Sequence, residues 1–154
     1  MNTHIEFCSE AFPALPGEED QINPGRWGRL LADYLRTELA ARGFPGEAPY
    51  SEDWGWAVPI DNAEYPLWVG CGNIEEGAAF GVTSSDPPKN QFLCFIEPSK
   101  PFVRRLFRKI DTTARVEALA QALEASLRRH PEIRDIRWCD YLGTTTSNQR
   151  LERP

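Results

Sequence analysis

Four short segments decide the fold: DWGWAV at residues 53–58, PLWVGC at 66–71, AAFGVT at 78–83 and QFLCFI at 91–96. Each is rich in aromatic or β-branched residues, and turn formers such as Asp61-Asn62 and Gly72-Asn73 separate them. This pattern predicts four β-strands. Because the joints are short, consecutive strands are expected to pair as an antiparallel meander.

The N-terminal part adds one strand and one helix. Ile5 and Phe7 alternate with polar residues, which predicts a half-buried strand over residues 3–9, followed by a loop over 10–22. Asn23-Pro24 predicts the start of an amphipathic helix over residues 24–42, because Asn caps free amides and Pro fits the first helical position. Gly43 suits the left-handed residue that closes a helix.

The C-terminal part predicts a short helix over residues 102–110, a longer helix and a last strand over 133–138. Asp111 or Thr112 caps the longer helix, and His130-Pro131 ends it. The order β-α-β-β-β-β-α-β favours an α+β fold with a mostly antiparallel sheet and two amphipathic helices packed on one face. We expect a single domain over residues 1–141 and a flexible tail over 142–154.

The composition is that of an ordinary globular domain, with 154 residues of which 41% are hydrophobic and 26% charged. The net charge of −6 and the pI near 5.0 disfavour a surface that wraps nucleic acid or anionic lipid. No apolar stretch approaches the roughly 18 residues of a membrane span, and no secretory signal pattern is present. We therefore expect a cytoplasmic protein without a membrane partner.

The four cysteines, Cys8, Cys71, Cys94 and Cys139, lie far apart and lack the C-x-x-C spacing of zinc or thioredoxin-type sites. Reduced and mostly buried thiols are favoured over the alternative of two disulfides, as is usual in a cytosolic protein. The sequence predicts no metal site and no cofactor.

The tryptophans between residues 54 and 68 could line a ligand surface. On a strand, Trp54 and Trp56 point to the same face and would form one aromatic patch. The alternative is a sheet core packed on Trp27 of the first helix. The carboxylates before the strand offer cation binding or acid/base chemistry, against the alternative of a solvated strand end. The candidate ligand or partner surface comprises Glu52, Asp53, Trp54, Trp56, Trp68 and Asn73.

Gly70-Cys71-Gly72-Asn73 is the most enzyme-like tetrapeptide of the chain. A cysteine at a strand end between two glycines would be exposed, as a nucleophile needs. His4 and His130 both have other expected places, so Cys71 lacks a base that would lower its pKa. Cys71 is therefore a weak catalytic candidate, and the alternative is a hairpin turn that happens to contain a cysteine.

Four motifs together resemble a family of short bacterial proteins of unknown function: NPGR at residues 23–26, EDWGW at 52–56, LWVGCGN at 67–73 and RLFRKID at 105–111. The resemblance covers roughly residues 3–139. It implies a bacterial, cytosolic single domain, and it supplies no activity and no catalytic residues.

The net charge hides an asymmetry along the chain. Residues 1–99 carry sixteen acidic and five basic residues, whereas residues 100–137 carry five acidic and ten basic ones. On the predicted helix over 102–110, one cationic stripe comprises Arg104, Arg105, Arg108 and Lys109. The stripe is a candidate anion-binding site for phosphate, an acidic partner or RNA. The alternative is that it neutralises the acidic half of its own domain.

These observations favour a non-catalytic binding or interaction module whose acidic surface binds a basic protein partner. An immunity protein that neutralises a cationic toxin is one version of this hypothesis. The alternative is a small enzyme, a hydrolase or transferase, with Cys71 near a tryptophan-lined cleft. The sequence leaves the oligomeric state open and disfavours a nucleic-acid partner.

Overall fold

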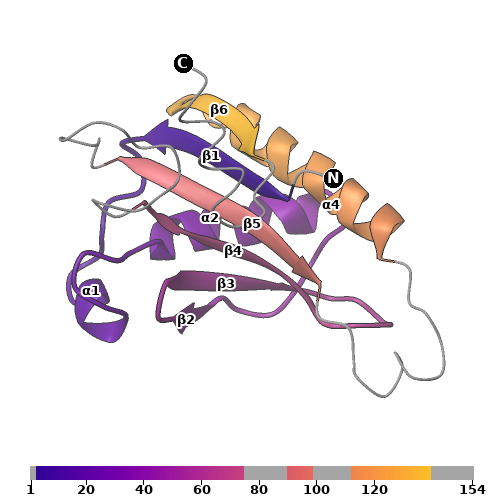
Figure 1. The fold of residues 1–154 in the computed structure, drawn as a ribbon, viewed down its shortest axis with the longest axis horizontal. Coiled ribbons are helices and arrows are strands. Elements are labelled where there is room, and N and C mark those ends of the chain that lie inside the picture. Colours follow the sequence, from indigo (N-terminus) through magenta and orange to yellow (C-terminus); the bar gives the residue numbers. More distant parts are fainter. Residues whose placement is uncertain (1–2, 75–89, 99–111, 140–154) are drawn as a thin grey trace.

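The computed structural model describes residues 3–74, 90–98 and 112–139, and there it is an α+β fold with one antiparallel sheet (Figure 1). The strands are β1 (His4–Ser9), β2 (Tyr50–Glu52), β3 (Gly55–Ile60), β4 (Leu67–Asn73), β5 (Gln91–Pro98) and β6 (Ile133–Cys139). The helices are α1 (Glu18–Gln21), α2 (Arg29–Ala41) and α4 (Thr113–Arg129). The predicted fold class is confirmed.

The sheet has the strand order β2-β3-β4-β5-β1-β6, and every neighbouring pair is antiparallel. Strands β3, β4 and β5 match three of the four segments that predicted the meander. The fourth segment, residues 78–83, lies outside the described residues. Strand β2 escaped prediction because its three residues are all exposed at the sheet edge and show no apolar alternation.

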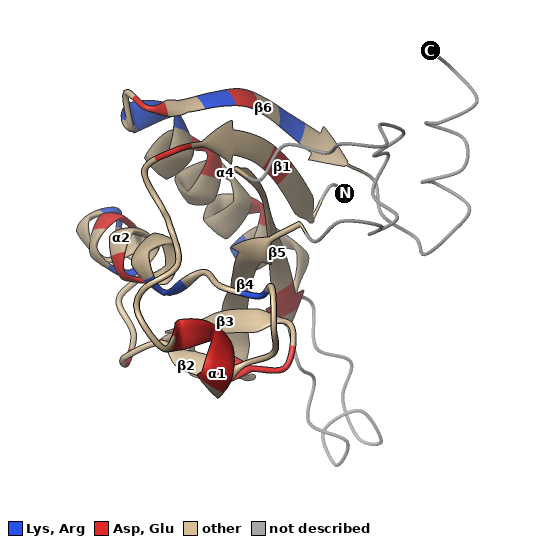
Figure 2. Ribbon diagram, turned by 90° about the vertical axis from the view of Figure 1, so that its left-hand side faces the viewer, with Lys and Arg blue, Asp and Glu red and all other residues tan. Residues whose placement is uncertain are grey.

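The core lies on one side of the sheet, which we call the helix-facing side. Its strand residues, with Ile5, Val58, Val69 and Ile96 among them, are almost fully buried together with the leucines of α2 and α4. Helix α2 contacts β3 and β4, α4 contacts β5 and β6, and the two helices contact each other (Figure 2). Because successive side chains of a strand point to opposite faces, every second strand residue lies on the opposite side of the sheet.

Helix α2 starts five residues later than the sequence predicts. Asn23-Pro24 does not begin it: Gly28 is the N-cap, and the Asn23 side chain instead donates a hydrogen bond of 2.8 Å to the Asp53 carbonyl. The predicted end is close, since α2 stops at Ala41 and Gly43 follows with φ 93°. The stretch predicted as a loop over residues 10–22 also contains the single turn α1.

The C-terminal elements follow the prediction where they are described. Helix α4 begins after Thr112, one of the two predicted caps, although the Thr112 side chain forms no capping hydrogen bond, and His130 closes the helix. Strand β6 runs one residue beyond the predicted 133–138, and Asp135, with φ 57°, lies near a shift in its register with β1. The predicted helix over 102–110 and the tail over 142–154 lie outside the described residues. No described helix is long and apolar enough to cross a membrane.

Candidate functional site

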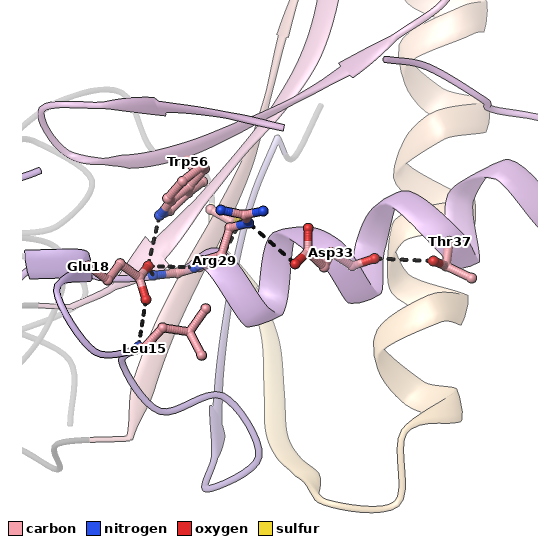
Figure 3. Close-up of polar contacts among 8 residues, drawn as sticks. Leu15, Glu18, Arg29, Asp33, Thr37 and Trp56 are labelled. Carbon is pink, nitrogen blue, oxygen red and sulfur yellow. Dashed lines mark hydrogen bonds and ion pairs between the residues drawn. The ribbon is translucent and has the colours of Figure 1, made fainter. Parts of the chain in front are cut away.

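A buried carboxylate organises the start of α2. Glu18 is only 3% exposed, and its Oε2 accepts hydrogen bonds from the backbone N–H groups of Gly28 and Arg29, both at 2.7 Å (Figure 3). The same oxygen accepts the indole N–H of Trp56 at 2.8 Å, and Oε1 accepts the Leu15 N–H at 2.9 Å. The negative charge satisfies amides that a helix N-terminus leaves free. Glu18 thus caps the N-terminus of α2, the role that the sequence predicted for Asn23.

A second buried side chain fixes the loop before α2, residues 23–28, which we call the 23–28 loop. Asn73, at the end of β4, is 5% exposed. Its Oδ1 accepts the Trp27 N–H at 2.9 Å, and its Nδ2 donates to the Gly25 carbonyl at 2.8 Å. Because both the oxygen and the NH₂ group of the amide form hydrogen bonds to the 23–28 loop, we infer that Asn73 positions this loop.

Trp54 and Trp56 lie on different sides of the sheet, so the prediction of one shared patch was wrong. Trp56 points to the helix-facing side, where it is 4% exposed and bonded to Glu18. Trp54 precedes β3 and stacks on Trp68, with ring centroids 5.6 Å apart. Gly55 between them has φ 155°, which turns the chain so that the two indoles diverge.

The opposite side of the sheet carries an aromatic cluster made of Trp54, Trp68, Phe95 and His4. Phe95 lies 5.0 Å from Trp54, 5.6 Å from Trp68 and 5.5 Å from His4, centroid to centroid. Burial is the main cause that lowers the pKa of His4. Gly70 lies beneath Phe95, where an added Cβ would approach the ring to 2.3 Å. Because Gly70 has no side chain, the end of the Phe95 ring has room above the strand.

A half-open hollow of about 190 Å³ lies beside the aromatic cluster, where the end of β4 meets the 23–28 loop. Its lining combines an arginine with apolar and aromatic groups: Arg26, Trp54, Asn73, Ile74, Leu93 and Phe95. Trp54 and Asn73 are the two members of the predicted surface that the structure brings to it.

Cys71 lies in the core, which corrects the prediction of an exposed cysteine at a strand end. Its side chain is fully buried on the helix-facing side, and its Sγ lies 4.0 Å from the Gly28 carbonyl. Burial raises the pKa of the Cys71 thiol far above its ordinary value, and the charges of Glu18 and Asp33 add to that effect. A neutral, solvent-excluded thiol is a poor nucleophile. None of the four cysteines forms a disulfide.

Glu52 and Asp53 are exposed at the turn between β2 and β3. They lie near Glu19 and Asp20 of α1, because Asn23 bonds to the Asp53 carbonyl and the Glu19 carboxylate accepts the Gly25 N–H at 2.7 Å. We call Glu19, Asp20, Glu52 and Asp53 the acidic surface (Figure 2). Within the described part of the chain, none of these four carboxylates forms an ion pair.

Several carboxylates elsewhere in the described part of the fold form ion pairs. Arg134 binds Glu10 at 2.7 Å, and Arg137 binds the buried Glu6 at 2.8 Å. On the helices, Arg128 binds Glu124 at 2.8 Å, and Arg129 reaches Glu38 at 3.4 Å. These four arginines of α4 and β6 thus neutralise carboxylates of β1, of the residue after it, of α2 and of α4, and none of the four forms an ion pair with the acidic surface.

The predicted cationic stripe, Arg104, Arg105, Arg108 and Lys109, lies outside the described residues. Within residues 3–74, 90–98 and 112–139, no three histidine, cysteine or acidic side chains are grouped to hold a metal ion. No family model, curated protein or solved structure matches this chain.

Sequence reasoning missed three of the residues that build this region: Glu18, Arg26 and Phe95. Glu18 belongs to an acidic run that looks solvated throughout, and only the fold separates it from its exposed neighbours. For Phe95 a signal existed. Gly70 and Gly72 within one strand mark a place where another group approaches the backbone closely.

Proposed function

We propose that this chain is a non-catalytic interaction module that binds a basic protein through the acidic surface of Glu19, Asp20, Glu52 and Asp53. The observation that supports the proposal is that these exposed carboxylates form no ion pair with any described residue, whereas Glu6, Glu10, Glu38 and Glu124 do. The sequence adds to it, since no Lys or Arg occurs between Gly43 and Ile74.

The scaffold beneath the acidic surface favours a preformed binding site. Glu18 and Asn73 hold α1, the 23–28 loop and the end of β4 together through buried and partly buried hydrogen bonds. A surface that is already ordered loses little conformational entropy when a partner binds. Concentrated negative charge also accelerates encounter with a basic partner, and salt weakens this effect over a distance of about 8–10 Å.

The alternative of a hydrolase or transferase loses its main support, because Cys71 is buried and its thiol stays protonated. We further infer a cytoplasmic location in a bacterium, in keeping with four cysteines that form no disulfide and with the motif resemblance. An immunity protein that neutralises a cationic toxin remains one version of this proposal.

Charge reversal on the acidic surface tests the proposal. The immobilised full chain is incubated with a lysate of the source organism at low and at high salt, and bound proteins are identified by mass spectrometry. We expect a partner rich in Lys and Arg that is retained at low salt, released at high salt, and lost with Glu52→Lys/Asp53→Lys.

The matched control is Glu117→Lys/Glu132→Lys, which changes the net charge equally at exposed carboxylates of α4 and of the turn before β6. It should keep the partner. Failure to retain any basic protein at low salt, or equal loss of the partner with both variants, contradicts the proposal.

A further inference from the structure

Two cysteines lie directly opposite each other on neighbouring strands of the sheet. Strands β4 and β5 pair with Cys71 opposite Cys94. Both side chains are fully buried among the core residues of the helix-facing side, and the structure has no disulfide between them. In the register of the described strands, Cys8 and Cys139 lie opposite other residue types. The fold therefore brings one pair of thiols together out of the four that the chain carries.

The hydrogen bonds between β4 and β5 show which kind of pair this is. Directly opposed residues of antiparallel strands alternate between hydrogen-bonded pairs, with Cα atoms about 5.5 Å apart, and non-hydrogen-bonded pairs, about 4.5 Å apart. The Ile74 N–H donates to the Gln91 carbonyl at 2.8 Å, so Ile74 and Gln91 are a hydrogen-bonded pair. Three steps along the same register, Cys71 and Cys94 are a non-hydrogen-bonded pair. Their side chains thus lie at the closer of the two spacings.

This spacing suits a disulfide. The Cα atoms of bonded cysteines are usually about 4.4–6.8 Å apart, and a non-hydrogen-bonded pair falls at the short end of that range. Both side chains also leave the sheet on the same face. A bond can therefore form with a small adjustment of the two strands. Geometry at the short limit stores strain, which makes a disulfide easier to reduce. The register favours a reversible bond over a permanent one.

From this register we propose that Cys71 and Cys94 form a reversible disulfide that joins β4 to β5 under oxidising conditions. The oxidant is a low-molecular-weight disulfide such as glutathione disulfide. One cysteine thiolate attacks it, forms a mixed disulfide and releases one glutathione thiolate. The second cysteine thiolate attacks the protein sulfur of the mixed disulfide and releases the other. Two electrons pass from the cysteines to glutathione disulfide, and the two protons that the cysteines lose end on the two glutathione thiolates.

Burial decides when this exchange takes place. Burial raises the pKa of both thiols, which keeps them protonated in the folded chain, whereas the attacking group must be a thiolate. A fully buried sulfur is also closed to glutathione. The exchange therefore proceeds while β4 and β5 are apart, during folding or transient opening, and folding then encloses the bond. The bond records the redox conditions under which the chain folds. It is independent of the proposed protein interaction, and each can fail without the other.

Refolding of the reduced full chain in glutathione buffers tests the proposal. The chain is unfolded in urea and refolded at several ratios of reduced to oxidised glutathione, then quenched in acid, and its remaining thiols are alkylated with N-ethylmaleimide in denaturant. Peptide mass spectrometry should show Cys71 bonded to Cys94. The equilibrium constant for this bond should be at least tenfold larger in native buffer than in concentrated urea, because a native disulfide stabilises the fold and strain offsets only part of that gain.

The matched control is Cys8→Ser/Cys139→Ser, which removes the other two thiols and should leave the equilibrium constant unchanged. Cys94→Ala should leave Cys71 without a protein disulfide, and Cys71→Ala serves the same purpose for Cys94 if the first variant does not fold. Excess reduced glutathione should restore both thiols after renewed unfolding and refolding. The proposal is overturned if Cys71 bonds mainly to Cys8 or Cys139, if no protein disulfide forms, or if the equilibrium constant is no larger in buffer than in urea.

Discussion

Replacing Glu18 by Gln should destabilise the protein far more than its position in an exposed acidic run suggests. The carboxylate is 3% exposed and accepts four hydrogen bonds at 2.7–2.9 Å, from the backbone of Leu15, Gly28 and Arg29 and from the Trp56 indole. Glutamine has nearly the same shape but carries no charge and only one acceptor oxygen. The substitution therefore changes hydrogen bonding with little change in packing.

The magnitude follows from these bonds. A hydrogen bond to a charged acceptor contributes about 1.5–3 kcal/mol, and one between neutral groups about 0.5–1.5 kcal/mol. In the variant, three donors keep a neutral acceptor, while the Leu15 N–H faces the new amide NH₂ group. A neutral amide costs less to bury than a carboxylate, which offsets part of the loss. We expect a decrease in the free energy of unfolding of about 2–4 kcal/mol, or roughly 5–15 °C in Tm.

Urea unfolding, followed by tryptophan fluorescence and far-UV circular dichroism, measures this decrease. The control is the neighbouring Glu19→Gln, because Glu19 is exposed and accepts one backbone N–H, that of Gly25. It should cost less than about 1 kcal/mol. Equal losses in the two variants would refute the assignment of Glu18 as the cap of α2.

Two further predictions concern the cysteines and the aromatic cluster. In the native protein, iodoacetamide should label the partly exposed Cys8 well before the fully buried Cys71 and Cys94. Peptide mass spectrometry measures the labelling of each cysteine. Preferential labelling of Cys71 would contradict its placement in the core. Gly70→Ala should lower the free energy of unfolding by about 1–3 kcal/mol, because the added Cβ would lie 2.3 Å from the Phe95 ring. Urea unfolding measures this loss. A variant that unfolds at the same urea concentration as the wild type would contradict the packing of Phe95 on Gly70.

Much of the fold could be predicted because its signals are local. Alternation of apolar and polar residues locates β1, and short apolar runs bounded by turn formers locate β3, β4 and β5. The start of α2 could not be found in this way. Its cap comes from Glu18, which lies ten residues before Gly28 in the sequence and reaches it only through the fold. Asn23-Pro24 offers a sound local cap, but the Asn23 side chain bonds to the β2–β3 turn instead.

The candidate site was harder to predict because it depends on which face of the sheet each side chain occupies and on the register between neighbouring strands. A regular strand places Trp54 and Trp56 together, and the backbone at Gly55 separates them. Phe95 reaches Trp68 because β4 and β5 pair with Gly70 opposite Phe95, a register that no single segment encodes. The acidic residues illustrate the same limit: Glu18 and Glu19 are adjacent and chemically identical, yet one is buried and the other exposed.

Three of the four motifs that carry the family resemblance meet at one junction. The NPGR segment binds the EDWGW segment through Asn23 and the Asp53 carbonyl, and it binds the LWVGCGN segment through Gly25 and Asn73. These contacts explain the motifs as structural connections and require no catalytic role for them. They also hold in place two groups that face solvent or the hollow, Asp53 and Arg26.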